Sequence, residues 1–196
     1  MKRLLVLLLL ATPLYAADYE LGLRHVAAVM TGDSGDLDLP LSRGFAAFAD
    51  VYWTKHLSTS AAATFVNPEA ILRDEVDLGT LGLDVYSATA RWHFAPDARL
   101  SAYAGAGAAL VQIGNLDDQF GDAYEADFAN ETTFAIEGGV HYRIQRVVLE
   151  LGVMYVPLEV EPRVHRATDP NIALPPKLGI DPVIVSIGAA WRFGAH

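Results

Sequence analysis

The sequence has no cysteine among its 196 residues. A disulfide scaffold, a thiol nucleophile and a thiolate metal site are therefore excluded. Basic residues are also few, because 14 lysines and arginines stand against 24 aspartates and glutamates, for a formal charge of -10. A chain this acidic is a poor ligand for nucleic acid, so we expect no nucleic-acid partner.

Long apolar runs are missing beyond the N-terminus. Apolar residues make up 52% of the chain, yet no later run reaches the roughly 18 residues of a membrane helix. Residues 1–16 have the pattern of a signal peptide for secretion, since Lys2 and Arg3 precede the apolar run Leu4–Leu10 and a small-residue cleavage site ends at Ala16. An uncleaved anchor is the alternative. Residues 17–196 are expected to form one domain.

What the sequence does have is short stretches in which apolar residues alternate with small or charged residues at period two. In Pro182–Phe193, one face carries Val183, Val185, Ile187, Ala189, Trp191 and Phe193, and the other is small or charged. Such alternation predicts a strand. Lipid would cover this apolar face in a bilayer, with aromatic residues at the interface. A soluble β-sandwich, which needs a second protein layer, is the alternative.

Eight such strands are expected, and their connections alternate in length. The connections after the second, fourth and sixth strands are short and the others are long, which is typical of periplasmic turns and external loops. We therefore predict an all-β fold: an eight-stranded antiparallel transmembrane β-barrel in the cell outer membrane, with both termini in the periplasm. The predicted strands are Tyr19–Thr31, Gly44–Thr54, Thr59–Val66, Leu81–Phe94, Leu100–Ile113, Thr132–Ile144, Val147–Val156 and Pro182–Phe193.

The inward positions near the periplasmic end carry both signs of charge. An eight-stranded barrel is just wide enough to be filled by side chains, and buried charges must pair. We therefore predict a salt-bridged ionic plug, with or without a role in blocking passage to the periplasm. Its expected members are Glu20, Arg24, Asp50, Arg91, Glu137, Arg143, Glu150 and Arg192.

The inward positions nearer the outside are apolar, where a water-filled pore would be polar. An apolar concave lumen is the usual form of a site for small molecules. Glycines at inward positions, such as Gly105 and Gly152, favour an open cavity, and complete filling by side chains is the alternative. The predicted hydrophobic pocket is lined by Val26, Met30, Phe48, Val111, Met154 and Val156.

Most acidic residues fall in the long loops, where a solvated rim is the simplest interpretation. Divalent cations beside lipopolysaccharide phosphates are the alternative, since hard cations prefer carboxylates. The spacing matches no calcium-binding loop. We predict no metal site and no cofactor, and expect lipid and lipopolysaccharide as the surroundings of the barrel.

Stretches typical of one known family lie at Tyr52–Val66, Arg91–Asp97, Tyr103–Gly107, Gly138–Tyr155 and Ile180–Phe193. They resemble the OmpW (outer-membrane protein W) family of eight-stranded barrels. The resemblance implies uptake of small hydrophobic molecules through an apolar pocket with lateral exit into the membrane. The family usually ends on an aromatic residue that the outer-membrane assembly machinery recognises, whereas here Gly194-Ala195-His196 follow Phe193. The long loop that contains Pro170, Pro175 and Pro176 also departs from the family.

Three functions are weighed. The first is passive uptake of a small hydrophobic solute, without catalysis. The second is a closed structural or adhesive barrel. The third is a lipid-modifying enzyme, which needs a serine beside a histidine and an acid. Ser186 and Ser87 are the candidate nucleophiles, but His93 and His141 are expected at the opposite, periplasmic end. We therefore predict that the protein is not an enzyme.

Overall fold

A computed structural model describes residues 18–32, 37–72, 76–114, 124–167 and 178–194. All regular structure in these ranges is β-strand. No helix in this part of the chain is long and apolar enough to cross a bilayer. The predicted signal peptide, residues 1–16, lies outside the described residues, as do Ala195 and His196.

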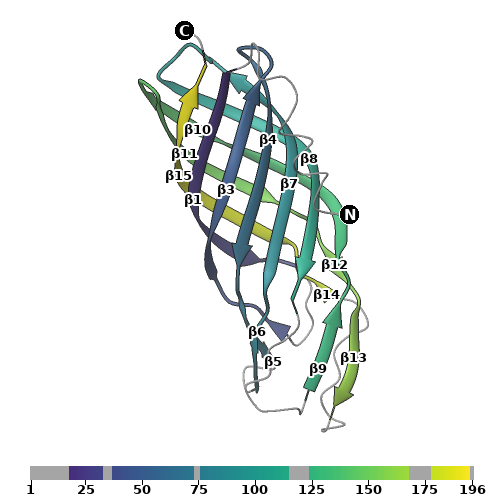
Figure 1. The fold of residues 1–196 in the computed structure, drawn as a ribbon. Coiled ribbons are helices and arrows are strands. Elements are labelled where there is room, and N and C mark those ends of the chain that lie inside the picture. Colours follow the sequence, from purple (N-terminus) through teal and green to yellow (C-terminus); the bar gives the residue numbers. More distant parts are fainter. Residues whose placement is uncertain (1–17, 33–36, 73–75, 115–123, 168–177, 195–196) are drawn as a thin grey trace.

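Eight strands form a closed antiparallel barrel, as predicted (Figure 1). Their order around the barrel is β1-β15-β11-β10-β8-β7-β4-β3, so each strand pairs with its neighbour in the chain and the last closes on the first. The predicted strands are confirmed, with small shifts at some ends. The barrel strands are β1 (Asp18–Met30), β3 (Ser42–Tyr52), β4 (Leu57–Val66), β7 (Leu83–Phe94), β8 (Leu100–Ile113), β10 (Glu131–Ile144), β11 (Val147–Tyr155) and β15 (Pro182–Phe193).

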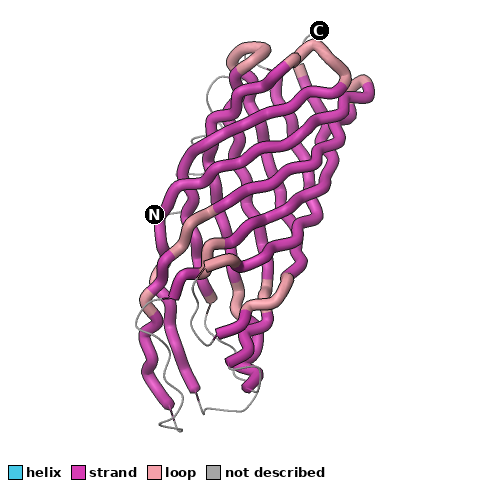
Figure 2. Tube along the Cα trace, turned by 180° about the vertical axis from the view of Figure 1, so that it is seen from behind, coloured by secondary structure: helices cyan, strands magenta, loops and turns pink. Residues whose placement is uncertain are grey.

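Closure of the barrel depends on the pairing of its first and last strands. The register runs from Tyr19 opposite Phe193 to Met30 opposite Pro182. The rings of Tyr19 and Phe193 stack with their centroids 4.8 Å apart. The strands run steeply oblique to the long axis of the barrel (Figure 2), as closure of a sheet into a barrel requires.

The short connections lie at one end of the barrel, beside Phe193, and the long ones at the other (Figure 1). We call these the short-turn end and the long-loop end. The long loops contain further strands that the sequence analysis did not predict, and these form three small sheets beyond the barrel wall. Those strands are β2 (Leu37–Asp38), β5 (Glu69–Leu72), β6 (Val76–Thr80), β9 (Tyr124–Phe128), β12 (Glu159–Val160), β13 (Pro162–Ala167) and β14 (Leu178–Gly179).

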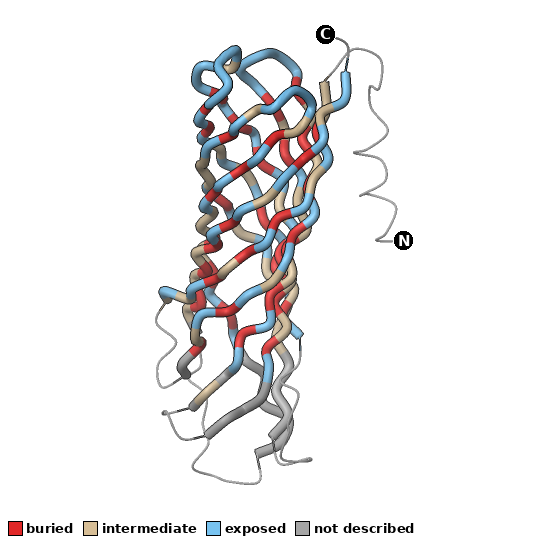
Figure 3. Tube along the Cα trace, turned by 90° about the vertical axis from the view of Figure 1, so that its left-hand side faces the viewer, coloured by how far each residue is buried: buried red, intermediate tan, exposed pale blue. Residues whose placement is uncertain are grey.

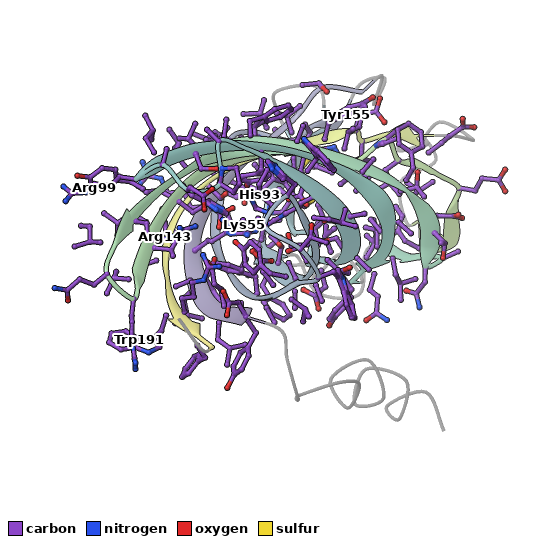
Figure 4. All side chains as sticks on the ribbon, turned by 90° about the horizontal axis from the view of Figure 1, so that it is seen from above. Lys55, His93, Arg99, Arg143, Tyr155 and Trp191 are labelled. Atoms are coloured by element: carbon purple, nitrogen blue, oxygen red, sulfur yellow. The ribbon has the colours of Figure 1, made fainter. Side chains whose placement is uncertain are left out.

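Burial alternates along the barrel strands (Figure 3). On β15, Ile184 is 2% exposed whereas Ile187 is 63% exposed. Successive side chains of a strand point to opposite faces, so Ile184 faces the interior and Ile187 the surroundings. Seen from the short-turn end, His93 points into the ring of strands, while Trp191 points away from it (Figure 4). The predicted inward and outward faces are therefore confirmed.

The interior has two layers. Charged and hydroxyl-bearing side chains fill the half nearer the short-turn end. A continuous group of buried apolar side chains fills the half nearer the long-loop end. We call the second group the apolar cluster. Its members are Val26, Ala28, Leu39, Ala46, Val66, Leu81, Leu83, Val85, Ala109, Val111, Ile113, Ala135, Val156, Leu158, Val160, Ile180 and Ile184, with Met30, Phe128 and Met154 packed against them.

Candidate functional site

The ionic plug is centred on Arg91 of β7, whose side chain is 1% exposed. Its Nη1 donates a hydrogen bond to Asp50 Oδ2 at 2.8 Å, and its Nε and Nη2 donate to the two oxygens of Glu137 at 2.8 and 2.6 Å. The hydroxyl of Thr89 also donates to Glu137. Two-point pairing of this kind is the strong form of an arginine–carboxylate contact. Arg91 thus joins carboxylates from β3 and β10 across the barrel.

A second ion pair joins Arg24 of β1 to Glu150 of β11. The Arg24 Nε and Nη2 donate to Glu150 Oε2 at 3.2 and 3.0 Å, and the Tyr103 hydroxyl donates to Glu150 Oε1 at 2.5 Å. The Arg24 guanidinium lies 3.8 Å from the centre of the Phe48 ring, and that of Arg91 lies 4.6 Å from the Tyr103 ring. Aromatic faces therefore complete the surroundings of both cations.

The remaining predicted members of the plug lie closest to the short-turn end. Arg192 Nη2 donates to Asp18 Oδ2 at 2.7 Å, while its Nη1 lies 3.6 Å from Glu20 Oε1. Asp18 was missing from the prediction because it precedes the strand expected to begin at Tyr19. Arg143 does not fit the predicted salt-bridged plug, because it donates to the backbone oxygen of Pro96 at 3.2 Å and thereby holds the neighbouring turn.

Two histidines lie in the plug, and one contacts a serine that sequence analysis missed. His93 Nε2 is 2.8 Å from Ser58 Oγ, and His141 Nε2 is 3.7 Å from Glu150 Oε2. Ser58 lies on β4, which a long loop connects to β7. Because no short turn sets the register of these two strands, the sequence did not show which serine would contact His93. Ser58 is 0% exposed, and no substrate can reach its hydroxyl in this conformation.

Five of the six residues predicted to line a hydrophobic pocket come together in the apolar cluster: Val26, Met30, Val111, Met154 and Val156. The three valines are at most 1% exposed. They come from β1, β8 and the chain just after β11, so closure of the barrel brings them together.

Phe48 departs from the prediction. It belongs to a separate group with Val148 and Ala190, and its ring lies against Arg24. The ring also covers the backbone of Gly22, its register partner on β1. Phe48 therefore packs within the polar half of the interior, beside the plug, and lines no part of the apolar cluster.

Among the residues that the structure describes, side chains pack closely through the interior of the barrel. A void at the boundary of plug and apolar cluster, beside Arg24, Val26 and Met154, measures ≈ 10 Å³, about enough for one water molecule. Gly105 and Gly152 do not open a cavity, because side chains lie over both of them. A Cβ atom on Gly152 would come within 2.8 Å of the Tyr103 hydroxyl, and one on Gly105 within 3.0 Å of Arg91 Cγ.

A break in the barrel wall lies between β10 and β11. Their pairing runs from Ile144 opposite Val147 to Ile136 opposite Tyr155 and stops there. Further out, the same two stretches of chain pair again, from Phe128 opposite Pro162. Between these ladders, β12 pairs with β14 instead, and the Val156 N–H donates to Pro182 O on the β15 side. We call the break, bounded by residues 129–135 and 156–161, the β10/β11 gap.

A hollow of ≈ 680 Å³ opens at the β10/β11 gap. Leu158 lines the hollow and is also a member of the apolar cluster, where it is 2% exposed. Phe134 lines it on the other side and is 56% exposed on the outer surface. The hollow therefore lies between the barrel interior and the lipid-facing surface. Its lining consists of Glu131, Thr132, Thr133, Phe134, Pro157, Leu158, Glu159, Gly179 and Asp181.

Comparison with known protein families decides the identity of the fold. The OmpW family model matches residues 61–193, from within β4 to the end of β15. The chain belongs to the OmpW family. This match covers more than half of the sequence and confirms the resemblance expected from the motifs. A search of the curated proteins by sequence found no match.

Solved structures show the same architecture at low sequence identity. OprG from Pseudomonas aeruginosa superposes with a TM-score of 0.79 at 12% identity, covering 92% of this chain and 97% of OprG. AlkL in DMPC lipid bilayers gives 0.66 at 16% identity, covering 94% of both chains. Ail of Yersinia pestis gives 0.57 at 16% identity, covering 91% of this chain and 99% of Ail. OprG and AlkL are outer-membrane proteins, and Ail is the attachment invasion locus protein.

As a member of the OmpW family, the chain is an integral protein of the cell outer membrane. Barrels of this class have short periplasmic turns and longer extracellular loops. The short-turn end of this OmpW-family barrel therefore faces the periplasm, and the ionic plug lies on the periplasmic side of the apolar cluster.

Proposed function

We propose that this OmpW-family barrel is a channel for passive uptake of small hydrophobic molecules. A solute enters the apolar half of the interior from outside and leaves sideways into the membrane through the β10/β11 gap. The observation that carries the proposal is the hollow at the gap, because Leu158 belongs both to its lining and to the apolar cluster.

The ionic plug supports sideways exit. Arg91 is held by Asp50 and Glu137, and Arg24 by Glu150, all with side chains at most 8% exposed. Removing one member of such a network leaves a buried charge without its partner, which is strongly unfavourable. An apolar solute would have to cross these charges to reach the periplasm directly. The path through the gap avoids them.

The filled interior means that passage requires side chains to move. Met30 and Met154, which pack against the apolar cluster, have flexible side chains that adapt to irregular shapes. Leu158 lies outside the barrel strands, in the chain between β11 and β12. Rotation of these three side chains would connect the interior to the hollow without breaking the ladders of the barrel.

The filled interior also favours a second candidate, a closed structural or adhesive barrel whose loops bind partners. The two candidates differ in one measurable respect, since only a channel speeds transfer of an apolar solute. Neither needs a catalytic group, and we propose that the protein is not an enzyme. The burial of Ser58 supports this, because its hydroxyl is the one placed against His93 Nε2.

Because the chain has no cysteine, a single introduced thiol can be used to block the gap. In Thr133→Cys, a bulky maleimide attached at the hollow should abolish protein-dependent uptake of a radiolabelled apolar solute into proteoliposomes. Arg43→Cys, an exposed position near the outer end of β3 on the opposite side of the barrel, is the matched control and should keep its uptake after labelling.

The possible results separate the candidates. Equal uptake by both labelled variants would place the exit elsewhere in the wall. If the unlabelled protein transfers solute no faster than empty vesicles do, the protein is a closed structural or adhesive barrel and not a channel.

A further inference from the structure

We infer that one side of the short-turn end binds a phospholipid of net negative charge from the periplasmic leaflet of the outer membrane. The site lies at the other end of the barrel from the β10/β11 gap, so the inference does not depend on the proposed channel. It follows from three properties of this side: arginines that lie close together, the absence of a described carboxylate that pairs with them, and an apolar and aromatic surface beside them.

The backbone brings three arginines of this end together. The Arg143 N–H on β10 donates to Arg99 O at 2.8 Å, so the two residues are direct neighbours. Arg146 follows Arg143 by three residues, which places it within roughly 10 Å. The Arg146 backbone oxygen accepts a hydrogen bond from the Arg192 N–H on β15 at 2.8 Å. We call Arg99, Arg143 and Arg146 the arginine arc, which runs from β8 past β10 toward β15.

The charge of the arginine arc is not neutralised within the described residues. Arg99 and Arg146 are exposed, and neither guanidinium has a hydrogen bond or ion pair in the part of the chain that the structure describes. Arg143 donates to a backbone oxygen and not to a carboxylate. Asp97 is the one carboxylate in the sequences of the three short turns, and its Oδ1 lies 2.9 Å from the Lys55 ammonium. The arc therefore offers unpaired positive charge.

The position of this charge in the molecule is specific. The chain is acidic as a whole, with a formal charge of -10, and most of its acidic residues lie in the long loops at the other end. An anion is therefore attracted to the short-turn end, which faces the periplasm. In this location the available anions include the phosphates of the membrane leaflet that surrounds the barrel.

The surface beside the arginine arc is suited to lipid. Leu100 and Tyr142 are register partners on β8 and β10, and they are 60% and 43% exposed on the outer surface. Seen from the short-turn end, Arg99 and Trp191 lie on the same side of the barrel (Figure 4). Tyrosine and tryptophan collect at the level of the lipid head groups. A guanidinium of the arc can thus reach a phosphate while the acyl chains contact Leu100 and Tyr142.

The chemistry of the arc selects among phospholipids. A guanidinium binds a phosphate through two parallel hydrogen bonds. The head group of phosphatidylcholine has a cation of its own that offsets its phosphate, whereas the head group of phosphatidylglycerol has none. Because Arg99 and Arg146 have no described carboxylate partner, the lipid with net negative charge is preferred.

The test measures lipid preference at a single tryptophan, since the chain has only three. Trp53→Phe with Trp92→Phe leaves Trp191, beside the arc. Each protein in phosphatidylcholine vesicles is titrated with brominated phosphatidylglycerol or brominated phosphatidylcholine, whose bromines quench nearby tryptophan fluorescence. Half-maximal quenching of Trp191 should need a mole fraction of the phosphatidylglycerol about fivefold lower than that of the phosphatidylcholine.

Two matched controls locate the preference. Trp92→Phe with Trp191→Phe leaves Trp53, next to the β3–β4 turn on the opposite side of the barrel, and should be quenched equally by both lipids. Lys55→Gln in the Trp191 protein removes a basic residue of the same end that already has a carboxylate partner, and should keep the preference. Arg99→Gln with Arg146→Gln should abolish it, with heat-dependent gel mobility as the check on folding.

Three results would overturn the inference. The first is equal quenching of Trp191 by the two lipids. The second is the same preference at Trp191 and Trp53, which would show general attraction of anionic lipid to the whole barrel. The third is a preference at Trp191 that survives replacement of both arginines. None of these results bears on the uptake assay, so the channel and the lipid site are judged separately.

Discussion

At the scale of single residues, Arg91 shows how the barrel interior accommodates a buried charge. Its guanidinium contacts carboxylates on two strands that are not neighbours of each other, Asp50 on β3 and Glu137 on β10. The contact spans the lumen and links opposite walls. A buried cation with two-point contacts of this kind contributes mainly because its carboxylate partners would otherwise be left unpaired.

Replacement of Arg91 by methionine should therefore lower the free energy of unfolding by about 3–5 kcal/mol, as measured by urea unfolding of the protein refolded into lipid vesicles. Glu137→Gln in the same background should recover part of the loss, because it removes one of the unpaired charges. An unchanged unfolding midpoint for Arg91→Met would mean that the plug is hydrated and open.

The exposed pair of Lys55 and Asp97 provides the control for that experiment. The Lys55 ammonium lies 2.9 Å from Asp97 Oδ1, and it lowers the pKa of that carboxyl by hydrogen bonding and charge attraction. Both side chains are largely exposed, 72% and 77%. Exposed ion pairs contribute little to stability, so Lys55→Met should unfold at nearly the same urea concentration as the wild type.

At the scale of elements, the hairpin of β10 and β11 is the least regular part of the barrel. It is paired near the short-turn end, open at the β10/β11 gap, and paired again between β9 and β13. Its turn at Gln145-Arg146 is tight, and Gln145 adopts a φ of 55°. This left-handed conformation is unfavourable for residues other than glycine, asparagine and aspartate.

Gln145→Gly should relieve that strain and raise the free energy of unfolding by about 0.5–1 kcal/mol, the difference between the left-handed penalty and the entropy that glycine loses on folding. Urea unfolding in vesicles measures the change. Arg146→Gly, at the adjacent turn position without a positive φ, should give no gain. A loss of stability in Gln145→Gly would show that the glutamine side chain has a stabilising contact.

At the scale of the whole molecule, lipid replaces the second protein layer that a soluble sheet would need. Large apolar side chains such as Leu23, Phe45 and Ile187 are more than 60% exposed. They are covered only when the barrel is in a membrane. The fold is stable in that solvent because closure leaves no free sheet edge within the ladder-paired wall.

The dependence on lipid predicts that charge on the outer surface is costly according to depth. Ile187 lies near the middle of β15, and Val183 lies near the end at the long loops. Ile187→Arg should lower the free energy of unfolding by about 2–4 kcal/mol and Val183→Arg by about 0–1 kcal/mol, measured in vesicles of the same lipid. Equal losses would contradict the assignment of the lipid-facing band.

The candidate site could be predicted from the sequence in part. Period-two alternation identified the inward face of each strand, so Arg24, Arg91 and Glu150 were assigned to the interior before any partner was known. Phe48 was assigned to the wrong layer, because its height depends on the pairing of β3 with β1. Ser58 and the β10/β11 gap were missed, since neither produces a local pattern.

By itself, the sequence determined that eight strands alternate between an apolar outer face and a mixed inner face, because that pattern is local to each strand. Only the tertiary structure decided which inward residues meet, since β4 and β7, like β11 and β15, are joined by long loops that set no register. It also decided that the lumen is filled and where the wall opens. Volume and pairing across a closed barrel depend on all strands together, so no single stretch of sequence specifies them.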